Sequence, residues 1–345
     1  MQKTAHVLVL LVAYFIWQKI GGILGLIVAA VVSGVIEMVF MVGLGAGGRS
    51  ARAILLYAVA VIVFGALFAP VLFWLVQIVG EITHSQWLLS QPFRRVLNRA
   101  VLLVAFVGLW PLLRALGFRS WSEIGFVRAP RWGRQVWLGI ALGLASLLVA
   151  GSISLALGAR VLDLSRPTSE VSCKLLGFLV TAVVVALLEE TFFRGGLLGA
   201  LRRSISLPVA LPVASAVYSA LHFLKPTSFD IAVADVRWYT GWECLRVVLT
   251  GSLATPGVAV GFVTLFLAGC ILGWALAKTG ALYLSIGLHA GWVFMLKTYA
   301  LLTAAGSGSV ARWLGAGAII ENVITWPVML LLFWVVSRIC REPAK

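Results

Sequence analysis

Two adjacent carboxylates and an arginine stand inside a long apolar stretch of the sequence. The segment reads LLEETFFRGG over residues 187–196 and contains Glu189, Glu190 and Arg194. Each ionisable residue at the centre of a membrane helix costs about 2.5–3.5 kcal/mol on insertion scales. This concentration of charge therefore indicates either a functional site or a structural ion pair.

Helical spacing separates the two acids. Glu190 and Arg194 are four residues apart and share one helix face, so we expect them to pair. Glu189 points about 100° away on a helix of about 3.6 residues per turn and shares that arginine less easily. A carboxyl group without a local partner, in surroundings of low dielectric constant, is typical of a general base.

Two histidines in later apolar runs are predicted to reach the depth of these acids. A rise of about 1.5 Å per residue places Glu190 about 20 Å before the turn at Arg203, and His222 about 21 Å beyond that turn. His289 lies about 16 Å past the break at Lys278, which falls on the same predicted membrane side. Three helices can therefore bring two acids and two histidines to one level inside the bilayer.

A carboxylate beside imidazoles can hold and deprotonate a water molecule, which then attacks a peptide carbonyl. The ligand set Glu189, His222 and His289 could instead bind a divalent metal that activates the water. We favour the metal-free reading and expect no cofactor, because the HExxH zinc spacing is absent. The GxSG serine motif and the GxGD aspartyl motif are absent as well.

The composition identifies the environment in which this chemistry would occur. Hydrophobic residues make up 61% of the 345 residues and charged residues 11%, against about 25% charged in soluble domains. This balance excludes a soluble enzyme, a nucleic-acid-binding protein and a disordered chain. The net charge of +15 comes from Lys and Arg in short breaks between apolar runs, a placement that suits anionic lipid headgroups.

Apolar runs near the length of about 20 residues needed to span a bilayer predict an all-α, polytopic transmembrane helical bundle of about ten spans. The polar break at 225–255 is long enough for a lid or a re-entrant segment. The distribution of Lys and Arg favours a multi-pass plasma (inner) membrane protein with cytoplasmic termini. The predicted runs are 5–17, 22–43, 52–79, 99–116, 135–158, 175–202, 208–224, 256–278, 282–302 and 317–337.

The motifs on these runs resemble the CAAX-protease and bacteriocin-processing (CPBP, or Abi) family of intramembrane proteases. That family has three motifs, EExxxR, FxxxH and HxxxN/D, on separate membrane helices. The first is complete here from Glu189 to Arg194. The second is present from Tyr218 to His222, with tyrosine at the aromatic position.

The third motif departs from the family pattern. It begins at His289 but ends in Val293, where the family usually has Asn or Asp. Valine cannot donate a hydrogen bond, so this role is lost, supplied by water, or moved to another residue such as Ser285 or Ser219. The resemblance covers about residues 135–302, the predicted protease core; residues 1–134 hold N-terminal membrane helices of unassigned role, and 303–345 a C-terminal helix and tail.

The resemblance implies a glutamate-type peptidase. Glu189 would act with His222 to activate water, Glu190 would orient the site with Arg194, and His289 would help to stabilise the oxyanion. The implied substrate is a membrane-anchored protein or peptide, such as a prenylated C-terminus, a leader peptide or the tail of another membrane protein. The predicted partners are this substrate and the lipid bilayer, with no nucleic acid.

Two other functions stay open from the sequence. A proton-coupled transporter could use the same acids and histidines as a relay, although its usual inverted repeats are not seen. A catalytically silent scaffold or immunity factor with the same fold is made plausible by Val293.

Overall fold

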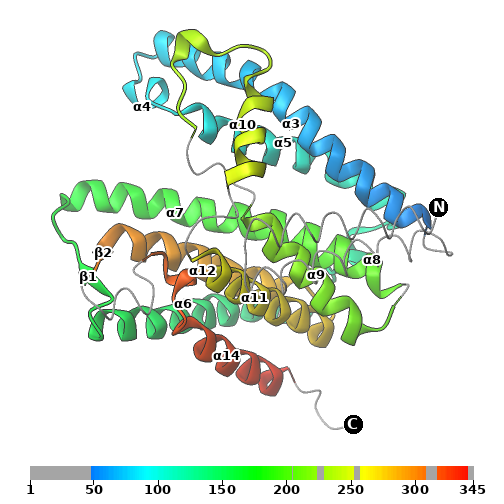
Figure 1. The fold of residues 1–345 in the computed structure, drawn as a ribbon. Coiled ribbons are helices and arrows are strands. Elements are labelled where there is room, and N and C mark those ends of the chain that lie inside the picture. The colour runs from blue at the N-terminus through cyan, green and yellow to red at the C-terminus, as the bar shows by residue number, and fades with distance from the viewer. Residues whose placement is uncertain (1–47, 204, 224–228, 252–256, 308–316, 341–345) are drawn as a thin grey trace. The chain divides into compact units, whose positions relative to one another are not determined.

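The computed structural model describes residues 48–203, 205–223, 229–251, 257–307 and 317–340 (Figure 1). The predicted runs 5–17 and 22–43 lie outside these ranges. The chain divides into a first unit, Met1–Gly117 with Leu221–Thr255, and a core unit, Phe118–Ala220 with Pro256–Lys345. The predicted boundaries after residues 134 and 302 stay a prediction.

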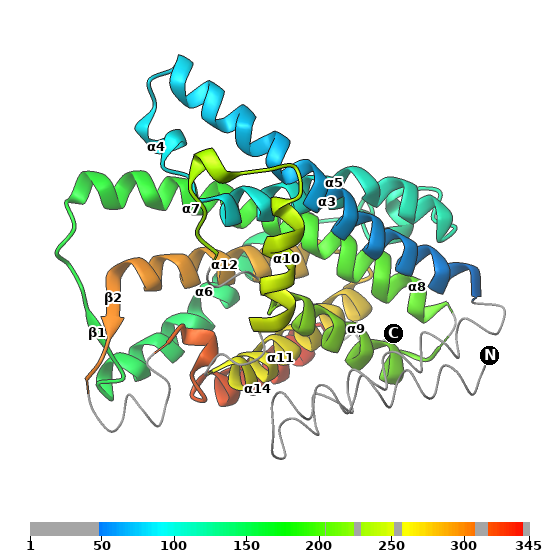
Figure 2. The same cartoon turned by 45° about the horizontal axis from the view of Figure 1, so that its top comes forward.

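Two long apolar segments fold into helices in the first unit (Figure 2). The helices of this unit are α3 (Gly48–Ile82), α4 (Gln86–Leu89), α5 (Phe93–Ala115) and α10 (Thr240–Gly251). The break at 225–255 thus contains a helix, preceded by the 3-10 turn η3 (Val233–Asp235). Val236 and Cys244 from this break are buried against Phe73 and Phe93, so this part of the break belongs to the unit's hydrophobic core.

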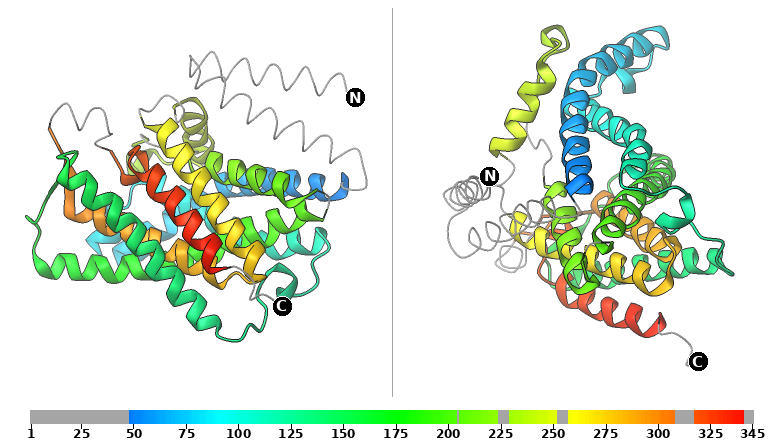
Figure 3. Two further views of the ribbon diagram at one scale, coloured as in Figure 1. Left: turned by 90° about the horizontal axis from the view of Figure 1, so that it is seen from below. Right: turned by 90° about the vertical axis from the view of Figure 1, so that its right-hand side faces the viewer.

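The core unit holds the segments that carry the predicted site. Its helices are α6 (Trp132–Ala156), α7 (Thr168–Glu189), η2 (Glu190–Leu198), α8 (Gly199–Arg202), α9 (Leu207–His222), α11 (Val258–Thr279), α12 (Tyr283–Leu302) and α14 (Thr325–Ile339). It also contains the 3-10 turns η1 (Trp121–Ile124) and η5 (Ile319–Glu321). The last two residues of α9 fall in the first unit's range. Figure 3 shows α14 lying along α11. Helices suit these apolar runs because every backbone polar group is then bonded within its own segment.

The predicted all-α fold is confirmed apart from one small sheet. Strands β1 (Arg160–Leu162) and β2 (Thr303–Ala305) pair antiparallel beyond the ends of α6 and α12. The Arg160 guanidinium fixes the pair, because it donates to the Thr303 carbonyl oxygen at 2.7 Å and to the Gly317 carbonyl oxygen at 3.1 Å.

Each predicted apolar run from residue 52 onward contains a helix, but the ten spans are not confirmed. Within the described ranges, five helices are long and apolar enough to cross a membrane: Leu56–Ile82, Phe93–Ala115, Trp132–Ala156, Thr168–Arg202 and Val258–Thr279. Helices α9 and α14 are apolar but shorter. The predicted run 317–337 begins with η5 rather than with a continuous helix, because the polar pair Glu321 and Asn322 lies inside it.

Helices α6 and α12 touch through glycines. A Cβ atom added to Gly139 would lie 2.5 Å from the Leu284 carbonyl oxygen, and one added to Gly287 would lie 2.2 Å from the Val136 carbonyl oxygen. One turn further along, Gly143 and Gly291 are equally close to the facing backbone. This GxxxG-on-GxxxG contact brings the two backbones together as in tightly packed membrane helices.

The turn that enters α12 is set by a second glycine feature. Gly280 adopts a left-handed φ of +67° and its N–H bonds to the Leu276 carbonyl oxygen at 2.8 Å, which ends α11. A left-handed residue at this position is a common helix stop and favours glycine. The chain then reverses into α12, which carries His289 seven residues after Leu282.

Candidate active site

The first motif lies where α7 changes helix type. Residues Glu190–Leu198 form the π-helix η2, in place of the regular α-helix assumed from the sequence. Such wide turns are rare and frequently occur at functional sites. Gly195 allows η1 to pack on this wide turn, since a Cβ there would lie 2.8 Å from the Ile124 carbonyl oxygen.

Glu190 is the centre of a buried charged network. Its Oε1 accepts a hydrogen bond from Arg194 Nη1 at 3.0 Å and lies 2.7 Å from His289 Nδ1. The side chains of Glu190, Arg194 and His289 are 0%, 3% and 4% exposed. The separation of Nδ1 and Oε1 is that of a hydrogen bond, in which an ionised carboxylate can only accept.

Glu189 lies on the other side of the same histidine. Its Oε2 is 3.7 Å from His289 Nε2, and its side chain is 20% exposed. This separation is too long for a direct hydrogen bond but within ion-pair range. His289 therefore faces both acids, with one ring nitrogen toward each, and Glu189 is the more accessible acid.

The aromatic ring of Tyr218 on α9 lies beside these groups. The Arg194 Cζ atom lies 4.2 Å from the centre of the Tyr218 ring, in cation–π contact. The ring meets His289 edge-on at 6.3 Å and Phe193 edge-on at 5.0 Å between centroids. The arginine is thus held between a carboxylate and an aromatic face.

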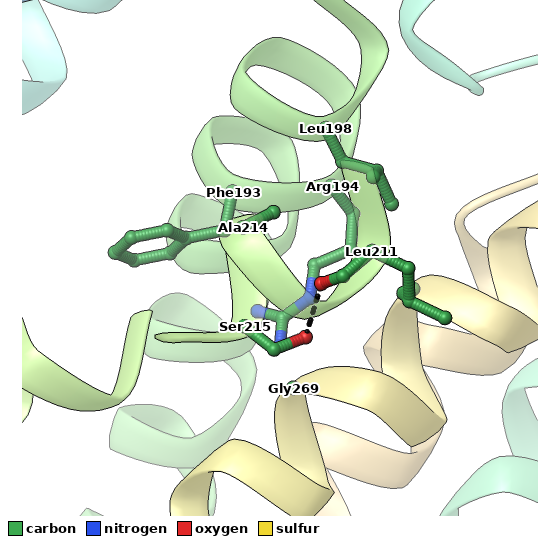
Figure 4. Close-up of a pocket in the computed structure, with 8 residues that line it drawn as sticks. Phe193, Arg194, Leu198, Leu211, Ala214, Ser215 and Gly269 are labelled. Atoms are coloured by element: carbon green, nitrogen blue, oxygen red, sulfur yellow. Dashed lines mark hydrogen bonds between the residues drawn. The ribbon is translucent and has the colours of Figure 1, made fainter. Parts of the chain in front are cut away.

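Behind Arg194 the packing is dry. Figure 4 shows the arginine among the residues that line a small pocket. This pocket has no room for a water molecule. The Ser215 hydroxyl at its edge donates to the Leu211 carbonyl oxygen at 2.8 Å. Its other lining residues are Phe193, Leu198, Ala214, Gly269 and Gly273. Exclusion of water strengthens the attraction between Arg194 and Glu190.

The position of His222 is fixed only along its own helix. It is the last residue of α9, four residues after Tyr218, and such a pair shares one helix face. By residue range it falls in the first unit, whereas Glu189, Glu190, Arg194 and His289 belong to the core unit. Its part in the site stays a prediction.

Val293 and the two serines considered as its replacement have other contacts. Val293 packs with the α7 residues Ala182 and Ala186 in an apolar cluster. The Ser219 hydroxyl donates to the Phe262 carbonyl oxygen at 2.7 Å. The Ser285 hydroxyl donates to the Leu272 carbonyl oxygen at 2.9 Å. Each hydroxyl has one proton, and each serine uses that proton in a hydrogen bond that links its helix to α11.

Of the three ligands considered for a metal, Glu189 and His289 lie together in the core unit, whereas His222 falls in the first unit's range. Across the part of the chain that the structure describes, no group of three or more His, Cys, Asp or Glu side chains is arranged to hold a metal ion. The Oε1 atom of Glu190 is already taken by Arg194 and His289.

Two features that position His289 were missed by the sequence analysis. The first is the glycine contact between α6 and α12, whose spacing is visible in the sequence as GIALG at 139–143 and GLHAG at 287–291. The second is Trp292, whose indole N–H donates to Ser146 Oγ on α6 at 3.0 Å. No local pattern in the sequence predicts that bond.

A segment of the chain matches a known protein family. The family model described as type II CAAX prenyl endopeptidase Rce1-like matches residues 171–295. Neither the curated proteins nor the solved structures contain a match to this chain. The family match confirms the resemblance to the CAAX proteases for residues 171–295, the segment that contains all five predicted site residues.

Proposed function

We propose that this protein is an intramembrane endopeptidase that uses a glutamate and histidines to activate water. Glu189 is the general base, and His222 helps to hold the water. Glu190 and Arg194 fix the orientation of His289, which faces the reacting carbonyl. The substrate is a membrane-anchored protein or peptide, and a prenylated C-terminus is the first candidate because of the family's description.

The proposed reaction is hydrolysis of one peptide bond. Glu189 takes a proton from the water as the water oxygen bonds to the carbonyl carbon, and an electron pair moves onto the carbonyl oxygen. When the intermediate collapses, the C–N bond breaks. The proton held by Glu189 passes to the leaving nitrogen, and the products are a carboxylic acid and an amine, which then ionise by transfer of the acid proton.

The observation that carries this proposal is that the two acids differ in their exposure and in their hydrogen bonds. Glu190 is fully buried and is committed to Arg194 and His289. Glu189 lies 3.7 Å from the other nitrogen of the same histidine and is partly exposed. A buried, hydrogen-bonded acid that orients a histidine, beside an accessible acid, suits water activation better than a structural ion pair alone.

The test is a comparison of protein termini in membranes that contain either the wild type or Glu189→Gln. We expect termini present with the wild type to be absent with the variant, while the variant inserts and unfolds at the wild-type temperature. A set of termini unchanged by Glu189→Gln would contradict the peptidase proposal. A cellular phenotype that survives loss of both Glu189 and His222 would favour the scaffold alternative.

Metal dependence has a separate test. A metal-free mechanism predicts that the purified protein retains its cleavage rate after treatment with EDTA or 1,10-phenanthroline followed by desalting. The control is re-addition of Zn²⁺ to the treated protein, which should leave the rate unchanged. Loss of cleavage on chelation and its recovery on Zn²⁺ addition would assign a metal to Glu189, His222 and His289 instead.

A further inference from the structure

We propose that the phenol hydroxyl of Tyr218 supplies the oxyanion hydrogen bond that Val293 cannot make. This inference rests on the proposed peptidase function and names one further catalytic residue for it. The chain departs from the family pattern at two positions, a hydroxyl gained at Tyr218 and a donor lost at Val293. We infer that the first departure compensates for the second.

Four neutral donors on the helices of the site bond to other groups. The hydroxyls of Ser219 and Ser285 donate to carbonyl oxygens of α11. The Thr191 hydroxyl donates to the Leu187 carbonyl oxygen of its own helix at 2.6 Å. The indole N–H of Trp292, three residues after His289, donates to Ser146 Oγ. These groups bond to their own or neighbouring helices, and none replaces a donor at position 293.

Tyr218 is placed at the reacting groups. Its ring meets the edge of His289 and covers the Arg194 guanidinium, and its side chain is buried. The charged groups acting on its hydroxyl include Glu189, Arg194 and Glu190. The hydroxyl is therefore a neutral donor in direct electrostatic interaction with the acid that we propose activates the water.

The ring contacts alone do not require a hydroxyl. A phenylalanine would give Arg194 the same aromatic face and would pack equally against Phe193 and His289. Burying a hydroxyl group costs free energy unless it makes hydrogen bonds. The Tyr218 hydroxyl makes a side-chain hydrogen bond with Arg194. Because a guanidinium only donates, the phenol oxygen accepts in that bond, and the O–H hydrogen takes no part in it.

In the proposed step the hydroxyl keeps its proton. As the water oxygen bonds to the carbonyl carbon, the Tyr218 O–H donates a hydrogen bond to the carbonyl oxygen, which gains negative charge. No bond to this hydrogen breaks, and the proton from water still goes to Glu189. The donor acts on charge that develops in the transition state, which is where such bonds are most effective.

The experiment compares Tyr218→Phe with wild type on a synthetic farnesylated CAAX peptide in detergent micelles. If the wild type does not cut that peptide, the probe is a synthetic peptide spanning a terminus that Glu189→Gln loses. We expect kcat to fall by about 10²–10³-fold, as when one oxyanion donor is removed, with KM unchanged and with the small fall in the unfolding midpoint that follows from losing one hydrogen bond. Tyr299→Phe is the matched control, because that buried hydroxyl bonds to the Gly151 carbonyl oxygen away from the site, and its kcat should stay at the wild-type value.

A second variant separates oxyanion stabilisation from positioning. Adding Val293→Asn to Tyr218→Phe restores a donor at the family position, and we expect kcat to recover by at least tenfold. Full activity of Tyr218→Phe would overturn the inference while leaving the peptidase proposal intact. So would a loss that Val293→Asn does not relieve, or one that appears as a raised KM with kcat unchanged. If the wild type cuts neither probe, the proposed function fails instead.

Discussion

Replacement of Gly287 by alanine should disturb the site without changing any charged group. The added Cβ would lie 2.2 Å from the Val136 carbonyl oxygen and 3.1 Å from the Gly139 Cα atom. Non-bonded heavy atoms prefer separations of about 3.5–4.0 Å, so α6 and α12 must move apart by about 1 Å. Gly287 is two residues before His289, which would move with the helix.

The expected loss of stability follows from three contributions. Overpacking strain costs about 1–3 kcal/mol, and alanine offsets this by about 1 kcal/mol through its higher helix propensity. The bond from His289 to Glu190, now 2.7 Å, would lengthen past the hydrogen-bonding limit of about 3.2 Å. Loss of this charged hydrogen bond adds about 1.5–3 kcal/mol, so we expect a net destabilisation of about 2–5 kcal/mol.

The assay is unfolding in mixed micelles, together with cleavage of the peptide probe. We expect the lower stability to accompany a fall in cleavage of about 10²-fold, which is typical when a catalytic group is displaced by about 1 Å. Gly133→Ala is the matched control on α6, because nothing lies within 4 Å of a Cβ added there. That variant should be at least as stable as wild type and fully active.

One result would refute this reasoning. If Gly287→Ala unfolds at the same denaturant concentration as Gly133→Ala and cleaves at the wild-type rate, the close contact of α6 and α12 does not position His289. A loss of stability with unchanged cleavage would separate the two effects. It would show that the contact serves folding alone.

Three further substitutions test individual contacts. Glu190→Gln should lower the free energy of unfolding by about 3–5 kcal/mol, because it leaves Arg194 buried without its counter-charge, and it should abolish cleavage; wild-type stability would contradict this. Ser219→Ala should keep the wild-type cleavage rate and lose about 0.5–1.5 kcal/mol in unfolding assays, since its hydroxyl bonds only to a backbone carbonyl in this structure. Trp292→Phe removes the bond to Ser146 and should cost about 0.5–1.5 kcal/mol; a cleavage rate below that of Gly287→Ala would show a larger role for this indole.

The sequence predicted the composition of the site better than its geometry. Charged residues in apolar runs are costly, so Glu190, Arg194 and His289 could be selected without an alignment. Their contact follows from helix rise and turn positions, and the structure brings these three side chains together. The π-helix was not predicted, because regular α-helical spacing was assumed through this segment.

The extent of the helices was predicted less well than their existence. Every apolar run within the described ranges holds a helix, since a hydrophobic run in lipid must bond its own backbone. Helix α10 was missed because its residues include charges and lack a long apolar run. Its buried face packs against α3 and α5. The small sheet was missed because Arg160 and Thr303 are 143 residues apart.

The sequence by itself determined the membrane class of this protein and the side chains that could do chemistry in it, because burial of charge in lipid has a cost that leaves few positions to consider. Helical spacing also predicted that Glu190 pairs with Arg194, whereas only the tertiary structure decided that His289 faces both acids and that Glu189 is partly exposed. That arrangement depends on the approach of α12 to η2, which the glycine contact with α6 permits and which no local stretch of residues encodes.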